Sequence, residues 1–174
     1  KRYSRGLVLK NEQPENIVEE MLSLWKKLEG HKLPVEKRKI LFVGEEISFA
    51  SRYRVEHFRE QLILRGYASR FIQMDQAEKE SLEEYEAIVL YRCSKLIEVE
   101  MLADRAKAAG IRVYYDIDDL VFDYEKIAGL HFLKGKEYSD FRTTAERIHG
   151  CMEFCDGYIT STETLAGVLR EEFS

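Results

Sequence analysis

The sequence predicts an α/β domain: a doubly wound parallel sheet with helices on both faces. Short, uninterrupted apolar runs of the kind that form buried parallel strands recur along the chain. They alternate with longer segments in which apolar residues recur at helical spacing. Glycines or capping residues separate the two kinds of segment, with few residues between them. This alternation is typical of strand–helix–strand units whose sheet is covered on both sides, with right-handed crossovers.

The first 38 residues differ from the rest of the chain. Their apolar residues recur at helical spacing and predict a helix on the stripe formed by Ile17, Met21, Leu24 and Leu28. Gly30 is placed to end this helix, and a polar connector follows. We therefore expect residues 1–38 to form an N-terminal helical extension or linker and residues 39–174 to form the α/β domain.

The first strand–helix–strand unit is predicted over residues 40–73. Residues 40–44 are apolar throughout and end in glycine, as in a buried parallel strand. A helix over about residues 51–65 follows, because Val55, Phe58 and Leu62 share one face and Gly66 can end it. Residues 67–73 are the second strand.

Residues 75–115 supply the next two strands. Asp75 to Glu78 has the pattern of a capping box and predicts a short helix. Residues 87–91 form the longest apolar run and are the third strand. A helix is expected over residues 96–109, ended by Gly110, and the fourth strand over residues 111–115.

The remaining sequence is irregular until a helix over about residues 139–155. Residues 157–160 are a short fifth strand, and Ser161 is expected to cap the last helix. About five parallel strands are therefore expected in all.

Composition disfavours several classes of protein. The chain has 27 basic and 32 acidic residues, whereas a duplex-binding domain is usually basic, so no nucleic-acid partner is expected. The longest apolar run has five residues, and a membrane span needs about 20. The three cysteines, Cys93, Cys151 and Cys155, fit a reducing compartment. Cys151 and Cys155, four residues apart on a predicted helix, are interpreted as buried apolar residues. No further Cys or His stands at ligand spacing beside them, so no metal site is expected.

Candidate site residues follow the predicted strands. Ligands of an open parallel sheet collect beyond the carboxyl ends of its strands, where the strand order reverses. The fourth strand leads into three aspartates, Asp116, Asp118 and Asp119. Arg52 and Arg54 stand at the start of the first helix, and Arg92 follows the third strand. Ser161 and Glu163 follow the fifth strand, and His131 lies in the irregular segment. We expect the arginines and aspartates to converge on one cleft.

The aspartates are the strongest of these candidates. Three carboxylates within four positions repel one another unless cations or N–H groups compensate, so such a cluster favours a functional role. Asp118 or Asp119 is expected to accept the proton of a substrate hydroxyl as a general base, and Asp116 to be structural. The alternative is that all three shape a turn or cap a helix.

The arginines at the first helix have two interpretations. Arg52 and Arg54 stand where helix N–H groups already favour anions, and they could bind a phosphate or carboxylate. The alternative is a solvated helix start in which Arg52 pairs with Glu56 at i, i+4 spacing.

Several enzyme signatures are missing from the sequence. No Gly-x-Gly-x-x-Gly follows the first strand, no Walker motif is present, and no Gly-x-Ser-x-Gly elbow occurs.

A receiver-like module needs a phospho-accepting aspartate after the third strand, where Arg92 stands instead, although Glu45 and Glu46 could supply its other acidic residues. A metal-dependent phosphohydrolase normally carries its nucleophilic aspartate after the first strand.

Three segments resemble one enzyme family. Residues 51–55 with 62–67, residues 116–122 and residues 155–166 are similar to the N-terminal, acceptor-side, Rossmann-like domain of bacterial group 1 glycosyltransferases of the GT-B type. The second segment resembles an aspartate-rich stretch in a branch acting on surface polysaccharides. The similarity covers about residues 39–174. The chain departs from the family in carrying Glu45 and Glu46 where many members have a glycine-rich loop.

The resemblance implies a hexosyltransferase-type glycosyltransferase. Its donor would be a nucleotide-sugar held by a C-terminal domain that lies outside this chain, so the 174 residues alone are expected to be inactive. The acceptor would be a glycan, a lipid-linked sugar or a protein, in polysaccharide or glycoconjugate synthesis. No metal and no other cofactor is obligatory in this class. The expected location is the cytoplasm or the inner face of the membrane, with peripheral membrane contact. The alternative function is a non-catalytic receiver-like or ligand-binding α/β module.

Overall fold

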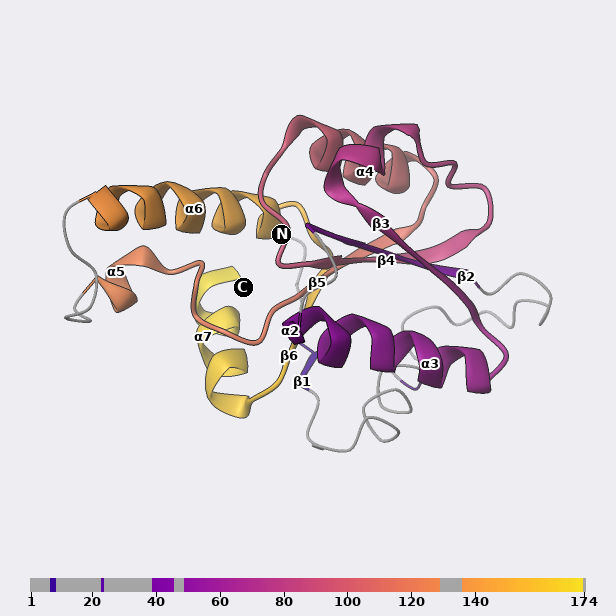
Figure 1. Cartoon of the computed structure of the whole chain (residues 1–174), viewed down its shortest axis with the longest axis horizontal. Helices are drawn as coiled ribbons and strands as arrows, with labels where there is room; N and C mark the ends of the chain where they lie inside the picture. Colours follow the sequence, from indigo (N-terminus) through magenta and orange to yellow (C-terminus); the bar gives the residue numbers. More distant parts are fainter. Residues whose placement is uncertain (1–6, 9–22, 24–38, 46–48, 129–135, 174) are drawn as a thin grey trace.

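The computed structural model describes residues 7–8, 23, 39–45, 49–128 and 136–173. These residues form a parallel sheet with helices on both faces (Figure 1), which confirms the predicted fold class. The strands are β1 (Leu7–Val8), β2 (Lys39–Gly44), β3 (Ala68–Gln73), β4 (Tyr85–Tyr91), β5 (Arg112–Asp116) and β6 (Gly157–Thr160). The helical segments are α2 (Phe49–Ser51), the π-helix η2 (Arg52–Glu56), α3 (His57–Leu64), the 3₁₀-helix η3 (Met74–Lys79), α4 (Ile97–Ala108), α5 (Tyr124–Ile127), α6 (Lys136–Met152) and α7 (Glu163–Phe173).

The order of the strands creates a reversal in the middle of the sheet. The described strands lie in the order β1-β6-β5-β4-β2-β3, and every neighbouring pair is parallel. From β2 the chain passes to β3 on one side and then returns to β4 on the other. Connections therefore leave β2 and β4 in opposite directions, and ligands of such sheets bind beyond the carboxyl ends of the strands at this reversal.

Each face of the sheet has its own apolar core. The helical segment from α2 to α3 covers one face through Val55, Phe58 and Leu62, as its spacing predicts. The opposite face packs against buried side chains of η3, α4, α6 and α7. Figure 1 shows α3 and α4 on opposite sides of the strands. Consecutive residues of a strand point to opposite faces, so each apolar strand contributes side chains to both cores.

Glycines end the two crossover helices as the sequence predicts. Gly66 follows α3 with a φ of 80°, and Gly110 follows α4 with a φ of 74°. In the first of these ends, Tyr67 N–H donates to the Leu62 carbonyl at 2.9 Å. Both glycines adopt the left-handed conformation that a side chain disfavours.

Two predicted helix caps are wrong by a residue or two. The last helix begins at Glu163, and Thr162 Oγ1, not Ser161, accepts the Leu165 N–H at 3.2 Å. The short helix after β3 is a 3₁₀-helix whose N-cap is Gln73, not Asp75; the Gln73 N–H donates to Gln76 Oε1 at 3.3 Å.

The N-terminal region contributes to the sheet in a way that the sequence did not predict. Leu7 and Val8 form β1 and pair with Ile159 and Thr160 of β6, which makes six strands instead of five. Two residues are too few to produce a recognisable pattern. The helix predicted over residues 17–28 lies outside the described residues apart from Ser23.

Candidate functional site at the carboxyl ends of the strands

A buried ion pair joins the first crossover helix to the end of β5. Arg54 Nε donates to Asp116 Oδ1 at 2.9 Å, and Arg54 Nη2 lies 2.8 Å from the same oxygen. Both residues are more than nine-tenths buried. The Nη2 group is close to the carboxylate but makes no well-directed hydrogen bond within the described residues. The Nε and Nη2 edge of the guanidinium therefore faces Asp116 Oδ1, and Nε alone makes a directed hydrogen bond to it within the described residues.

The position of Arg54 depends on an irregularity in its helix. Residues 52–56 form a π-helix within the continuous helical segment from Phe49 to Leu64. In this stretch both Arg54 and Val55 are buried against the sheet, and the guanidinium lies 5.9 Å from the centre of the Phe58 ring. Single π-turns inside α-helices occur often at functional sites.

A second ion pair lies one strand away. Arg92, directly after β4, contacts Asp118 Oδ1 through Nε at 2.9 Å and through Nη2 at 2.7 Å, and its Nη2 lies 4.0 Å from Asp119 Oδ2. Both close contacts end on Oδ1, so within the described residues Asp118 Oδ2 is left for another group. We call Arg54, Arg92, Asp116, Asp118 and Asp119 the Arg–Asp cluster.

Arg92 is held in a strained backbone conformation. Its φ is 48°, and among the described residues other than glycine it alone has a positive φ. Its N–H donates to the Asp116 carbonyl at 3.2 Å, which ties the end of β4 to the end of β5. The left-handed region costs a residue with a side chain about 1 kcal/mol, and such outliers concentrate at functional sites.

Tyr91 lies beside the cluster with an unpaired hydroxyl. Its side chain is 5% exposed, and its Oη has no hydrogen-bond partner among the described residues. Tyr91 is the register partner of Asp116 on the neighbouring strand, so the two side chains leave the same face of the sheet. Burial first, and then the nearby Asp118 carboxylate, raise the pKa of this hydroxyl, so it remains protonated at neutral pH.

The three aspartates form a gradient from the interior to the surface. Side-chain exposure is 3% for Asp116, 26% for Asp118 and 64% for Asp119. Asp116 is held by Arg54, whereas Asp119 Oδ1 accepts the Leu120 N–H at 2.8 Å. Asp118 is both fixed in position by Arg92 and accessible from outside, which is the combination that a general base needs.

Burial also changes the acidity of Asp116. Loss of solvation raises the pKa of its carboxyl to about 6, and the Arg54 guanidinium acts in the opposite direction. Asp116 is therefore mostly ionised at pH 7 and becomes neutral in mildly acidic solution.

The structure brings together most, but not all, of the predicted site residues. Five of them form the Arg–Asp cluster described above. Arg52 is exposed, and Glu56 pairs with Arg59 at 2.7 Å instead of with Arg52. Ser161 is exposed, and Glu163 pairs with Arg170 at 3.0 Å. His131 lies outside the described residues.

Of the two cysteines predicted to be buried, Cys151 is buried and Cys155 is only partly buried. Cys93 is buried as well, and all three are free thiols. The Cys93 thiol donates to the Val43 carbonyl at 3.2 Å, and burial raises its pKa well above the usual range. Cys93 therefore fixes the ends of β2 and β4 relative to each other instead of acting as a nucleophile.

Comparison with known proteins does not assign the chain to a family. No family model matches the chain, and no curated protein matches it significantly. Function is therefore argued from the geometry and chemistry of the site.

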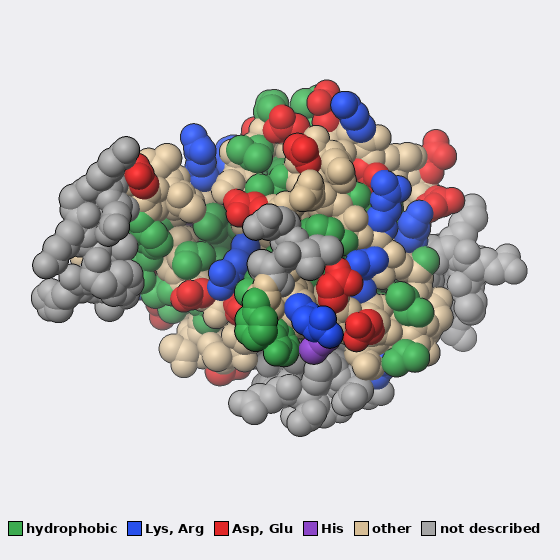
Figure 2. Space-filling model, in the orientation of Figure 1, with side chains coloured by type: hydrophobic (Ala, Val, Ile, Leu, Met, Phe, Trp, Pro, Cys, Tyr) green, Lys and Arg blue, Asp and Glu red, His purple; other side chains and the backbone are tan. Residues whose placement is uncertain are grey.

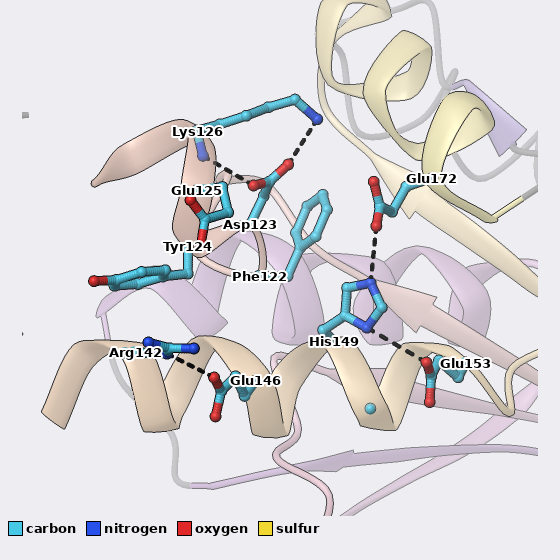
Figure 3. A pocket seen from close by; sticks show the side chains of 11 residues that line it. Phe122, Asp123, Tyr124, Glu125, Lys126, Arg142, Glu146, His149, Glu153 and Glu172 are labelled. Carbon is cyan, nitrogen blue, oxygen red and sulfur yellow. Dashed lines mark hydrogen bonds and ion pairs between the residues drawn. The ribbon is translucent and has the colours of Figure 1, made fainter. Parts of the chain in front are cut away.

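A separate hollow lies between α5, α6 and α7 (Figure 3). It has a volume of about 580 Å³. Its basic side chains are paired with carboxylates: Lys126 with Asp123 at 2.6 Å, Arg142 with Glu146 at 2.8 Å, and His149 with Glu172 at 3.1 Å. None of its lining residues belongs to the Arg–Asp cluster. Of these ion pairs, only His149–Glu172 joins two helices, α6 and α7, and the Arg142 guanidinium lies 5.2 Å from the centre of the Tyr124 ring in α5. The hollow is therefore interpreted as a junction between helices.

The molecular surface carries charges of both signs. In Figure 2, acidic and basic side chains are mixed across the visible face, and neither sign dominates it. Within the described ranges, no three His, Cys, Asp or Glu side chains are grouped so that they could hold a metal ion. None of the helices in those ranges has the length and apolarity that a bilayer crossing requires.

Proposed function

We propose that this chain is the acceptor-binding half of a GT-B glycosyltransferase, which moves a sugar from a nucleotide-sugar to an acceptor hydroxyl. The observation that carries the proposal is the Arg–Asp cluster, which lies at the carboxyl ends of β4 and β5 beside the reversal of strand order. It combines a fixed and accessible carboxylate with a strained arginine. Beside it lies the buried Tyr91 hydroxyl, which has no partner among the described residues. Sheets of this type bind their ligands at this place.

In the proposed reaction, Asp118 is the general base. The acceptor hydroxyl transfers its proton to Asp118 Oδ2 as its oxygen forms a bond to the anomeric carbon of the donor. The bond from that carbon to the nucleotide's terminal phosphate breaks, and the nucleoside diphosphate leaves. Arg92 positions Asp118 by holding Oδ1, and Asp116 keeps Arg54 in place. The donor itself would bind to a second domain outside this chain.

A receiver-like module is the competing proposal. It would share the observed strand order, but it requires a carboxylate at the end of β4 to accept a phosphoryl group. Arg92 stands there instead, and its guanidinium is bound to Asp118. This observation favours the glycosyltransferase proposal.

The test is a transfer assay on the protein in which this chain is joined to its donor-binding half. Asp118→Asn and Asp119→Asn are made separately. Loss of the general base should lower kcat by 10²–10⁴-fold in Asp118→Asn, while Asp119→Asn retains most activity. If both variants keep normal turnover and only melt at lower temperature, the catalytic role of the cluster is wrong.

A further inference from the structure

Two buried hydrogen-bond donors at the cluster lack partners among the described residues. Arg54 Nη2 has N–H groups that no oxygen accepts in a well-directed hydrogen bond, and the Tyr91 hydroxyl is unpaired. A buried hydroxyl left without a partner costs free energy, whereas Arg54 Nη2 still has Asp116 Oδ1 at 2.8 Å. A tyrosine hydroxyl retained at this cost is best explained by a ligand that supplies the missing partner.

The two donors belong to one locus. Arg54 Nη2 lies 2.8 Å from Asp116 Oδ1, and Asp116 is the register partner of Tyr91 on the neighbouring strand. The Arg92 guanidinium lies 5.9 Å from the centre of the Tyr91 ring. Arg54 comes from the helix over one face of the sheet, and Tyr91 and Asp116 leave that same face at its carboxyl edge. A single ligand group at this edge could therefore meet both donors and the accessible carboxylate.

The charge balance of this locus disfavours an anionic ligand. Two arginines face three aspartates, so the fully ionised cluster carries one net negative charge. Each guanidinium is also already bound to a carboxylate of this chain. A phosphate or carboxylate would meet Asp118 and Asp119 beside either arginine, and like charges that close repel.

The donor and acceptor groups that are available match a hydroxyl. A hydroxyl oxygen can accept hydrogen bonds from Arg54 Nη2 and Tyr91 Oη, and its own proton can be donated to Asp118 Oδ2. We infer that Tyr91 and Arg54 form a subsite for an uncharged sugar hydroxyl, so the acceptor presents a neutral glycan unit and not an acidic or phosphorylated one. This inference rests on the proposed function and narrows its acceptor.

The experiment titrates the 174-residue chain with defined glycosides and follows the side-chain Nε–Hε signals of Arg54 and Arg92 by NMR. The neutral probes are the methyl glycosides of glucose, galactose and mannose. The anionic probes are glucuronic acid, glucose 6-phosphate and inorganic phosphate. Tyr91→Phe is compared with Tyr158→Phe, which removes another buried tyrosine hydroxyl, one that donates to the Met152 carbonyl away from the cluster.

We expect at least one neutral glycoside to shift the arginine signals. Its affinity should fall about tenfold in Tyr91→Phe, the loss of one hydrogen bond, and should be unchanged in Tyr158→Phe. A second variant, Asp118→Asn, should weaken neutral binding and should strengthen binding of phosphate, because it removes a repelling charge.

Other outcomes separate the two proposals. If the anionic probes bind more tightly than the neutral ones, or if Tyr91→Phe binds neutral glycosides as well as the wild type, the inference is wrong while an acceptor-binding role survives. If no glycoside of either kind binds at the cluster, the proposed function itself fails, and the inference fails with it.

Discussion

At the scale of single residues, two buried tyrosines of the sheet offer a direct comparison. The Tyr158 hydroxyl donates to the Met152 carbonyl at 3.1 Å, whereas the Tyr91 hydroxyl has no partner among the described residues. Tyr158→Phe should therefore lower the free energy of unfolding by about 1 kcal/mol, and Tyr91→Phe should leave it unchanged or raise it. Urea denaturation of both variants measures this. An equal loss in the two variants would mean that Tyr91 is an ordinary structural residue.

Asp116 gives a prediction about pH. Its pKa is raised in the fold to about 6 from an ordinary value of 3.8, so the folded state binds the extra proton between these values. The stability contributed by this residue is therefore present below about pH 4 and is lost as the pH rises through 6. Relative to Asp116→Asn, the wild type should lose on the order of 1 to 3 kcal/mol between pH 4 and pH 7. A difference that stays constant, or that moves the other way, would contradict the assignment.

The site can be predicted from sequence only in part. The positions of Arg54, Arg92 and Asp118 after strands, or at a helix start, are sufficient to indicate one edge of the sheet. Their pairing is not predictable, because it depends on a π-helix and a positive φ that leave no pattern in the sequence. Sequence reasoning misses Tyr91 because this residue ends an apolar run and resembles a core residue; the only available signal is its place at the strand's carboxyl end.

At the scale of elements, the glycines that end helices can be separated from a glycine inside one. Gly66 and Gly110 have positive φ and open space where a methyl group would stand, and Gly167 lies inside α7 with equally open space. Gly66→Ala and Gly110→Ala should each destabilise the fold by about 1 kcal/mol through backbone strain alone. Gly167→Ala should stabilise it by up to about 1 kcal/mol, because alanine favours the helix. Thermal unfolding of the three variants is the measurement, and a stabilised Gly66→Ala would contradict the backbone argument.

Most elements follow from the sequence, and the errors have physical causes. Gly66 and Gly110 correctly mark where two helices end because only glycine adopts that conformation without cost. Cap positions are harder to predict: Ser161 and Thr162 are adjacent hydroxyl residues, and the choice between them depends on how the chain leaves β6. The strand β1 could not be found, because two residues that add to a sheet edge carry no periodicity.

At the scale of the whole molecule, the strand order determines where a ligand can bind. The alternation of strands and helices predicts a parallel sheet, but it does not give the order of the strands. The observed order puts the reversal between β2 and β4, and the Arg–Asp cluster lies on the adjoining ends of β4 and β5. The topology thus brings Arg54 and Arg92 to the three neighbouring aspartates after β5, from which they are distant in sequence.

Whether this chain holds the acceptor and not the donor can be decided by offering it both. The 174-residue chain is incubated with a nucleotide-sugar, and nucleotide release is measured alongside NMR titrations with the nucleotide-sugar and with neutral methyl glycosides. We expect no nucleotide release, no binding of the nucleotide-sugar, and glycoside-induced shifts confined to signals of the Arg–Asp cluster and its neighbours. Turnover of the nucleotide-sugar by these residues alone, or tight binding of it at the cluster, would show that the acceptor assignment is wrong.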